Sequence, residues 1–311
     1  QAAQAGHTVY ATMRNLSKRG VMVEVVAESC VTVHVAQLDV QDAASIAVCV
    51  DQIIAAEGHF DVLSNNAGAG FVRSSEQASE EDINWVMDVN FMGVVRCTKA
   101  LIAHFRERRA GHVITISSVG GLVGQPFNEV YCAAKFAVEG YMEAMASYIS
   151  PNFGINFTVV EPGGIASEFA ANVMKQVEET GGMLEDEYLP ILQKYVGGAQ
   201  DRAAGGDIYQ TADEVAAVVM ECVASDAPPI RTRTSKWGEA FCALKPDLDC
   251  IGAGHAVFCD DEGQGASVLL NRSDEEIVQA LRIHLPPHLG LFEGAFDPVM
   301  MGPWAIVRGN D

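Results

Sequence analysis

Residues 118–135 read SVGGLVGQPFNEVYCAAK, and this stretch decides the fold of the chain. It continues from an apolar run, HVITIS, which predicts a buried strand that ends at the serines. It leads into residues 129–149, where apolar side chains recur at close to helical spacing. A strand, a glycine-rich loop and a long helix in this order indicate an α/β domain.

Tyr131 and Lys135 are the candidate catalytic pair of this stretch. They are four residues apart, so on a helix they lie on one face and close enough to interact. A neighbouring ammonium group favours the phenolate and lowers the pKa of a tyrosine, which makes it a usable general acid or base. The same spacing also occurs on exposed helix faces as a solvated pair. The strand, Ser118 and the glycines Gly120, Gly121 and Gly124 favour the catalytic interpretation.

Ser118 is the third candidate, because it ends the predicted strand. Ligands of open α/β sheets bind beyond the carboxyl ends of the strands. The Ser118 hydroxyl is therefore placed to orient a carbonyl or alcohol oxygen that faces Tyr131.

Five short sequence motifs occur once each along the chain. In order, they are NNAG (65–68), DVNFMG (88–93), ISSVGG (116–121), PFNEVYCAAKFAVEG (126–140) and EPGGIASEF (161–169). In these motifs, across roughly the first 245 residues, the sequence resembles the short-chain dehydrogenase/reductase family. Within the family it is similar to the branch of 17β-hydroxysteroid dehydrogenase type 1 and its bacterial relatives. The resemblance implies a doubly wound (Rossmann) parallel sheet and a nicotinamide-dependent oxidoreductase.

The resemblance also assigns roles to single residues. It implies catalysis by Ser118, Tyr131 and Lys135, with Asn90 bending a helix and holding a water that relays protons to Lys135. Tyr131 and Lys135 would also hold the cofactor. The other cofactor contacts that the motifs imply are Asp39, Val40, Asn66, Ala67, Gly68, Pro162, Gly163, Ile165 and Ser167. Ser167 stands where the family usually has threonine, so a hydroxyl is kept.

Arg14 indicates which cofactor is used. NAD-binding folds place an acid after the second strand to bind the ribose 2′-hydroxyl, whereas an arginine suits a 2′-phosphate. Here Arg14 follows the predicted strand His7–Thr12, with Lys18 and Arg19 close behind. A solvated basic turn is the alternative. The resembling branch uses this arginine for NADP, so we expect NADP rather than NAD.

The glycine-rich TGxxxGxG phosphate loop of the family is missing from the sequence, as is the strand before it. We therefore expect an N-terminally truncated chain that lacks about 20 residues of a βαβ unit. The missing strand would lie at the centre of the sheet, between the strands predicted at His7 and at Phe60. The late run HAVFCD (255–260) is a less favoured substitute for it.

Two regions are expected: a Rossmann domain in residues 1–250 and a C-terminal extension of unknown role in residues 251–311. Residues 168–198 resemble the substrate lid of the family, with a Gly181-Gly182 hinge. Apolar side chains such as Phe169, Met174 and Leu184 in this segment favour an apolar substrate of steroid, retinoid or acyl type. Two packing helices without a lid function would fit the same pattern.

The composition narrows the range of partners. The net charge of −21 argues against nucleic acids and anionic membranes. The eight cysteines include no CxxC pair, which is typical of a reduced compartment, so we expect a cytoplasmic protein and no metal site. No apolar run is long enough to insert into a membrane. The family resemblance implies a homodimer or homotetramer.

Two functional hypotheses follow. The first is an NADP(H)-dependent oxidoreductase for an apolar secondary alcohol and its ketone. The second is a truncated, non-catalytic family member that acts as a binding or interaction protein. Reduction of 3-oxoacyl thioesters is a variant of the first, whereas NNAG disfavours the sugar-nucleotide epimerases that share the Tyr–Lys pair.

Overall fold

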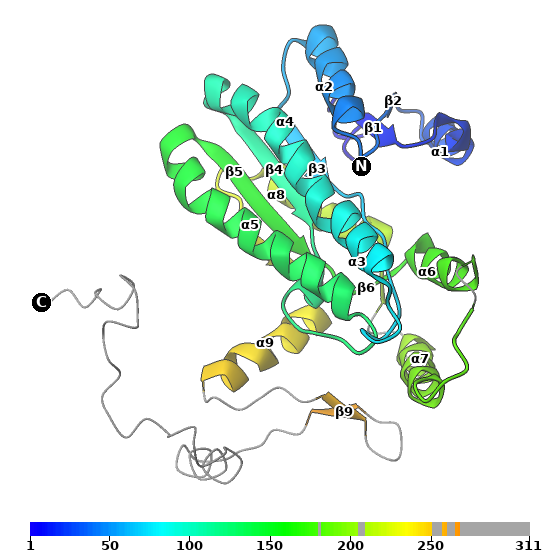
Figure 1. The fold of residues 1–311 in the computed structure, drawn as a ribbon. Helices are drawn as coiled ribbons and strands as arrows, with labels where there is room; N and C mark the ends of the chain where they lie inside the picture. Colours follow the sequence, from blue (N-terminus) through cyan, green and yellow to red (C-terminus); the bar gives the residue numbers. More distant parts are fainter. Residues whose placement is uncertain (180–181, 205–208, 251–256, 260–264, 268–311) are drawn as a thin grey trace, which may run out of the picture. The chain divides into compact units, whose positions relative to one another are not determined.

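The computed structural model describes residues 1–179, 182–204, 209–250, 257–259 and 265–267. Residues 1–245 belong to one compact unit. Its main sheet consists of parallel strands in the order β3-β4-β5-β8 (Figure 1). The bounds are β3 Val62–Asn65, β4 Gly111–Ile116, β5 Ile155–Glu161 and β8 Arg231–Arg233. This all-parallel sheet, with helices in the crossovers, confirms the predicted α/β class.

The other strands form separate pairs. β1 (Tyr10–Met13) and β2 (His34–Gln37) are parallel, as are β6 (Gly164–Ala166) and β7 (Tyr209–Thr211). Within the described residues, β1 pairs only with β2, and β3 pairs only with β4. β1 is thus an end strand of the two-stranded sheet, and β3 is an end strand of the main sheet. The missing strand was expected between these two strands. In the second compact unit, β9 (Val257–Cys259) pairs antiparallel with β10 (Gly265–Ser267). The described part of the HAVFCD run therefore does not pair with β1 or β3 as a substitute for the missing strand.

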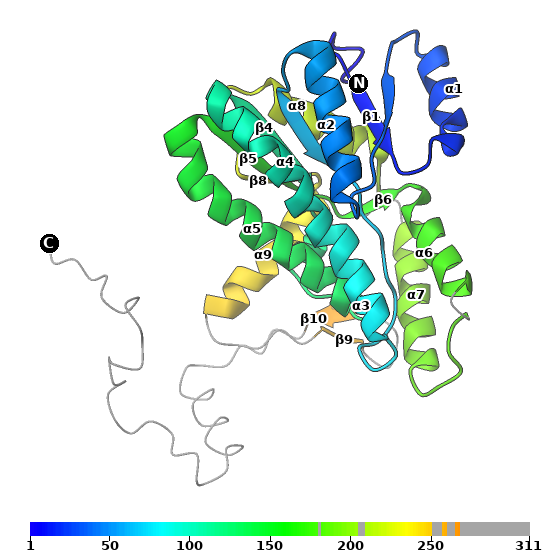
Figure 2. The ribbon, with the colours of Figure 1, turned by 45° about the horizontal axis from the view of Figure 1, so that its top comes forward.

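Helices cover both faces of the main sheet (Figures 1 and 2). α4 and α5 pack on one face, and α8 packs on the other through Cys222, Val219 and Val223. Two predicted helix starts are confirmed: Asp42 caps α2, and Thr211 forms a capping box with Glu214 at the start of α8. The bounds are α1 Gly20–Glu28, α2 Ala43–Glu57, α3 Glu80–Met87, α4 Gly93–Arg108, α5 Glu129–Phe153, α8 Ala212–Ala224 and α9 Lys236–Cys250.

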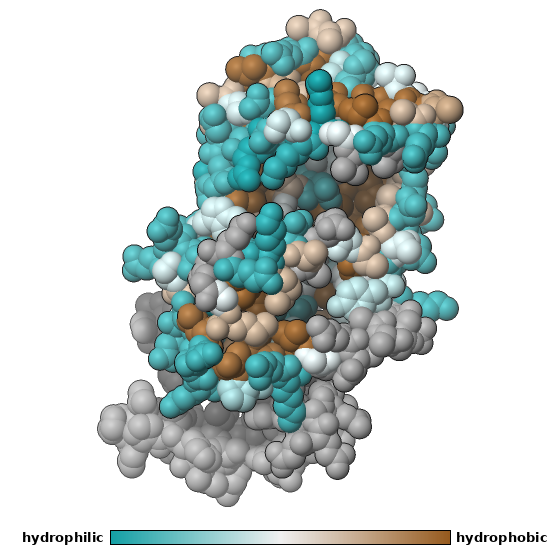
Figure 3. Space-filling model, turned by 90° about the vertical axis from the view of Figure 1, so that its right-hand side faces the viewer, coloured by the Kyte–Doolittle hydropathy of each residue, from teal (hydrophilic) through white to brown (hydrophobic). Residues whose placement is uncertain are grey.

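The segment expected to form a lid contains two helices, α6 (Glu168–Glu179) and α7 (Leu189–Ala204). Apolar side chains on it remain exposed, namely Phe169, Met174, Leu184 and Ile191. Figure 3 views the molecule from the side on which α6 and α7 lie in Figure 1, and it shows brown apolar patches among teal polar ones. No described helix has the length and apolar character needed to cross a bilayer. The helix predicted over residues 274–284 lies outside the described residues.

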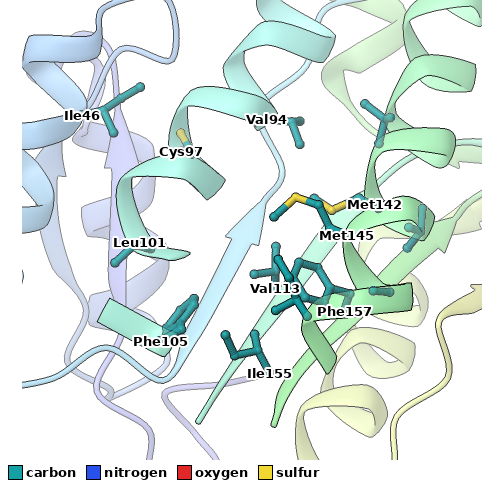
Figure 4. Close-up of a cluster of buried hydrophobic side chains, with 14 of the residues drawn as sticks. Ile46, Val94, Cys97, Leu101, Phe105, Val113, Met142, Met145, Ile155 and Phe157 are labelled. Carbon is teal, nitrogen blue, oxygen red and sulfur yellow. The ribbon is translucent and has the colours of Figure 1, made fainter. Parts of the chain in front are cut away.

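The largest apolar core lies between the sheet and the helices α2, α4 and α5 (Figure 4). α4 contributes Leu101 and Phe105, and β5 contributes Ile155 and Phe157, all of them buried. Side chains that recur every three or four residues along α5, such as Val138, Met142 and Met145, fill the same space. This packing fixes α5 against β4 and β5, which determines where Tyr131 and Lys135 can point.

Candidate active site

The predicted site residues lie at the carboxyl ends of the parallel strands. Arg14 follows β1, and Asp39 follows β2. In the main sheet, Asn66–Gly68 follow β3, Ser118 follows β4, and Pro162 follows β5. Open α/β sheets bind their ligands at this edge.

Ser118 and Tyr131 face each other across the start of the active-site helix. Ser118 caps the short 3₁₀ helix Val119–Gly121, and its Oγ accepts a hydrogen bond of 3.0 Å from the Gly120 amide. Burial raises the pKa of Tyr131 to about 12, while the hydrogen-bonding side chain of Ser118 lowers it. A substrate oxygen near both hydroxyl groups would have two polar partners.

Lys135 is buried one turn after Tyr131. Its Nζ lies 5.7 Å from the centre of the Tyr131 ring and donates a hydrogen bond of 2.9 Å to the carbonyl oxygen of Ile116. Burial lowers the pKa of Lys135 to about 8, and the Glu139 carboxylate raises it. Lys135 is thus buried and Tyr131 half-buried, so the two do not form a solvated surface pair.

The pKa of Tyr131 differs from the value that the sequence led us to expect. The sequence predicted that the ammonium group would lower the pKa of the phenol. In the structure burial dominates instead, so the pKa of Tyr131 is raised to about 12. The same burial lowers the pKa of Lys135, because a low-dielectric surrounding disfavours both charged forms.

Asn90 occupies a π-helical turn, Asp88–Met92, that joins α3 to α4. It is fully buried, and its Nδ2 donates to the carbonyl oxygens of Ala69 and Val86 at 2.9 Å each. Its Oδ1 accepts from the Ala69 amide at 3.0 Å. Asn90 therefore holds the loop after β3, and single-turn π bulges of this kind occur frequently at functional sites.

Gly68 connects Asn90 to Lys135. A Cβ atom at Gly68 would lie 3.1 Å from Asn90 Oδ1 and 3.8 Å from Lys135 Nζ. In the NNAG motif, the residues Asn66, Ala67 and Gly68 are exposed. The structure thus links Gly68, Asn90, Lys135, Tyr131 and Ser118 through close approaches.

The residues expected near adenine have structural partners. Asp39 Oδ1 accepts from the Gln41 amide at 3.0 Å, which is a turn-forming role. Val40 packs against Gly93, where a Cβ atom would lie 2.9 Å from that of Val40. Arg14 follows β1 and is exposed, and the Gln37 side chain donates a hydrogen bond to its carbonyl oxygen. The exposed Arg14 guanidinium leaves the prediction of a 2′-phosphate contact open to test.

The segment after β5 is anchored to the Ser118 loop. The Val119 amide donates to the Pro162 carbonyl oxygen at 2.9 Å. Gly163 runs close under Trp237, since a Cβ atom there would lie 2.9 Å from the indole ring. Ile165 lies on β6, and Ser167 Oγ accepts from the Phe169 amide at the start of α6.

Three features of the site were not predicted. The Phe169 ring lies 6.1 Å from that of Tyr131, which brings α6 to the candidate catalytic tyrosine. Lys135 bonds a backbone carbonyl group, which leaves no trace in sequence. Glu139 is buried one turn after Lys135 and acts on it electrostatically, and Glu161 is buried beside Glu139. The available signal was an acidic residue at an apolar position of a helix and another at an apolar position of a strand. In the part of the chain that the structure describes, no group of three or more His, Cys, Asp or Glu side chains could hold a metal ion.

Comparisons with known proteins show what this chain is similar to. The profile of the short chain dehydrogenase family matches residues 1–178. Retinol dehydrogenase 8 of Bos taurus is 37% identical over 249 residues, which cover 77% of this chain and 76% of that protein. The 17-beta-hydroxysteroid dehydrogenase type 1 of Homo sapiens is 34% identical, over 73% and 69% of the two chains. A crystal structure of a short-chain dehydrogenase from Streptomyces avermitilis matches with a TM-score of 0.64 and 26% identity, over 81% of this chain and 89% of that one.

Proposed function

The chain belongs to the short-chain dehydrogenase family, and on that premise we propose that it is an NADP(H)-dependent oxidoreductase. It interconverts an apolar secondary alcohol and the corresponding ketone. The observation that carries the proposal is the linked arrangement of Ser118, Tyr131 and Lys135, with Lys135 Nζ 5.7 Å from the phenol ring. Asn90 supports the backbone beside them.

Each residue has a chemical role in ketone reduction, for which the bound nicotinamide would supply the hydride. Tyr131 is protonated at neutral pH, and this is the form that donates a proton to the substrate oxygen. Ser118 orients that oxygen by a hydrogen bond. Protonated Lys135 stabilises the phenolate that remains after the proton has moved. Asn90 holds the loop that borders Lys135 and would hold a water molecule that relays protons to Lys135.

The residues present fit the nicotinamide and ribose half of the cofactor. Gly68 leaves room between Asn90 and Lys135, because a Cβ atom would come within 3.1 Å of Asn90 Oδ1. Asn66, Ala67, Pro162, Gly163, Ile165 and Ser167 would line the same half. Arg14 would bind the 2′-phosphate of NADP, and Asp39 and Val40 would border the adenine. An arginine at this place favours NADP over NAD.

The apolar lid helices support an apolar substrate. Phe169 is 42% exposed and its ring lies 6.1 Å from the Tyr131 ring, so an apolar surface borders the reacting group. Similarity to a retinol dehydrogenase and a hydroxysteroid dehydrogenase favours steroid-like or retinoid-like substrates, with acyl chains as a third class.

A homodimer formed through α4 and α5 is part of the proposal. A groove on these helices is lined by Ile102, Arg106, Met145, Tyr148, Ile149 and Phe153. Tyr148 is 57% exposed there, so its ring is accessible to a second copy of the chain. The mass in solution, measured by light scattering, tests this assignment.

A second candidate is a family member that binds partners without catalysis. This candidate is favoured by the strand pairing, because β1 and β3 belong to separate sheets and do not pair with each other. A fluorescence titration of the chain with NADPH separates the two functions. Tight binding, followed by NADPH oxidation with steroid ketones, retinaldehyde or a 3-oxoacyl thioester, supports the enzyme; absence of binding supports the alternative.

A further inference from the structure

Two buried carboxyl groups, one on the active-site helix α5 and one on β5, have no role in the chemistry described so far. Glu139 is one turn after Lys135 on α5, and Glu161 is the last residue of β5. Their exposed fractions are 4% and 0%. Burying a carboxylate is costly unless it is paired, so this placement requires partners.

Two arginines of β8 provide those partners. Arg231 Nε lies 3.0 Å from Glu139 Oε2 and 3.6 Å from Glu161 Oε1. Arg233 is opposite Glu161 in the strand register, with its Nε 3.3 Å from Glu161 Oε2. The four side chains join α5 to the ends of β5 and β8.

The hydrogen bonds indicate that the two carboxyl groups do not both carry a charge. Both oxygens of Glu161 and Oε1 of Glu139 are buried and accept no hydrogen bond. If both groups were ionised, the Glu161 oxygens would depend on the ion pairs with Arg231 and Arg233 and would have no hydrogen bond. A proton on Glu161 creates a hydrogen bond to Glu139, which is close enough for it. Burial, with a further contribution from the Glu139 charge, raises the pKa of Glu161 to about 7.

The other charged or titratable groups around the pair lie on three elements. Glu143 of α5 bonds Arg231 at 2.8 Å, and its side chain is 59% exposed. On α9, Glu239 bonds Arg233 at 3.2 Å, and Cys242 interacts with Arg233. Lys135 of α5 is the cation on the side of the active site, and Glu139 acts on it electrostatically.

The pair also borders the loop that carries Ser118. A Cβ atom at Gly121 would lie 3.2 Å from Glu139 Oε1 and 2.7 Å from Ser117 Oγ. The negative charge is therefore close to the catalytic groups, because Tyr131, Lys135 and Glu139 follow one another at intervals of four residues along one face of α5.

We propose that Glu139 is a positioning residue for the Tyr131–Lys135 pair: it shares one proton with Glu161, and the negative charge that remains keeps Lys135 protonated. Arg231 holds that charge on Glu139 through its bond to Oε2. The use of the charge in catalysis rests on the proposed function, whereas the shared proton is a property of the chain alone.

The first experiment titrates Lys135 directly. The chain has only seven lysines, so the ¹³Cε resonance of Lys135 in labelled protein can be assigned by its loss in Lys135→Met. Glu139→Gln should lower the midpoint pH of this resonance by about one unit, because an opposite charge has been removed. Glu143→Gln is the matched control, since it bonds the same arginine from the exposed side of the same helix, and it should leave the midpoint in place. An unmoved midpoint in Glu139→Gln, or an equal shift in both variants, overturns the proposal.

The second experiment detects the shared proton by infrared spectroscopy. Wild-type protein at pH 6 should show the carbonyl stretch of a protonated carboxylic acid, and folded Glu161→Gln and Glu139→Gln should both lack it. Absence of the band from wild type, or its persistence in both variants, contradicts proton sharing. Neither measurement needs a substrate. If the chain turns over a ketone, Glu139→Gln should also shift the alkaline limb of kcat to lower pH without a matching change in KM.

Discussion

The Nζ atom of Lys135 donates a hydrogen bond of 2.9 Å to the carbonyl oxygen of Ile116, the last residue of β4. The bond joins α5 to the strand that leads into Ser118. It also keeps a basic group in a buried position, which has a cost in stability. Unfolding measurements on variants of Lys135 can determine this cost.

Replacing Lys135 with methionine should stabilise the chain at neutral pH. The pKa of Lys135 is about 8 in the folded state against an ordinary 10.5, so the unfolded state binds more protons between these values. Stability contributed by this group therefore rises with pH across that window, and the full penalty is present below pH 8. We expect Lys135→Met to raise the free energy of unfolding at pH 7 by up to about 3 kcal/mol.

Urea unfolding at several pH values measures this difference. The advantage of Lys135→Met over wild type should shrink as the pH is raised from 8 to 10.5. Lys99→Met replaces an exposed lysine on α4 and serves as the control with no such trend. A difference between Lys135→Met and wild type that stays constant from pH 8 to 10.5 would contradict the buried cation.

Gly68→Ala should disturb the site although it adds a single methyl group. The new Cβ atom would lie 3.1 Å from Asn90 Oδ1, and Asn90 is held by three hydrogen bonds that resist movement. We expect a loss of about 1–3 kcal/mol in stability, together with weaker NADPH binding. Gly124→Ala is the control, because nothing lies within 4 Å of a Cβ atom there. Equal melting temperatures for the two variants would show that the Gly68 backbone is not confined.

Phe169→Ala should weaken the binding of apolar substrates. The Phe169 ring lies beside the Tyr131 ring and close to the backbone of Gly70. Its removal therefore opens the apolar side of the site. We expect KM for a steroid-like or retinoid-like ketone to rise about tenfold, since about 1.4 kcal/mol of apolar contact is lost. Ile191→Ala on α7 tests whether any exposed apolar residue of the lid has this effect. A similar rise in KM for both variants would argue against a specific role for Phe169.

Much of the architecture could be predicted because local signals and tertiary packing agree. The capping residues Asp42 and Thr211 begin their helices as expected, and the apolar spacing of residues 129–149 matches the buried face of α5. The branch resemblance is matched by similarity to 17-beta-hydroxysteroid dehydrogenase type 1. The residue roles implied by the motifs and the choice of NADP remain predictions.

The features that could not be predicted depend on contacts between distant segments. The pKa of Tyr131 is governed by burial, which a Tyr–Lys spacing does not reveal. Glu161 meets Glu139 only because β5 and α5 pack together, and Arg233 meets Glu161 only through the β5–β8 register. Sequence also gives no indication that Lys135 bonds a backbone carbonyl group.

The most direct test of the account is the turnover of Tyr131→Phe with NADPH and a responsive ketone. Tyr148→Phe removes an exposed hydroxyl from the same helix and is the matched control. If Tyr131 is the proton donor, its variant should lose about 10²–10⁴-fold in kcat while NADPH affinity stays at the wild-type value. Wild-type turnover in Tyr131→Phe would contradict the central claim.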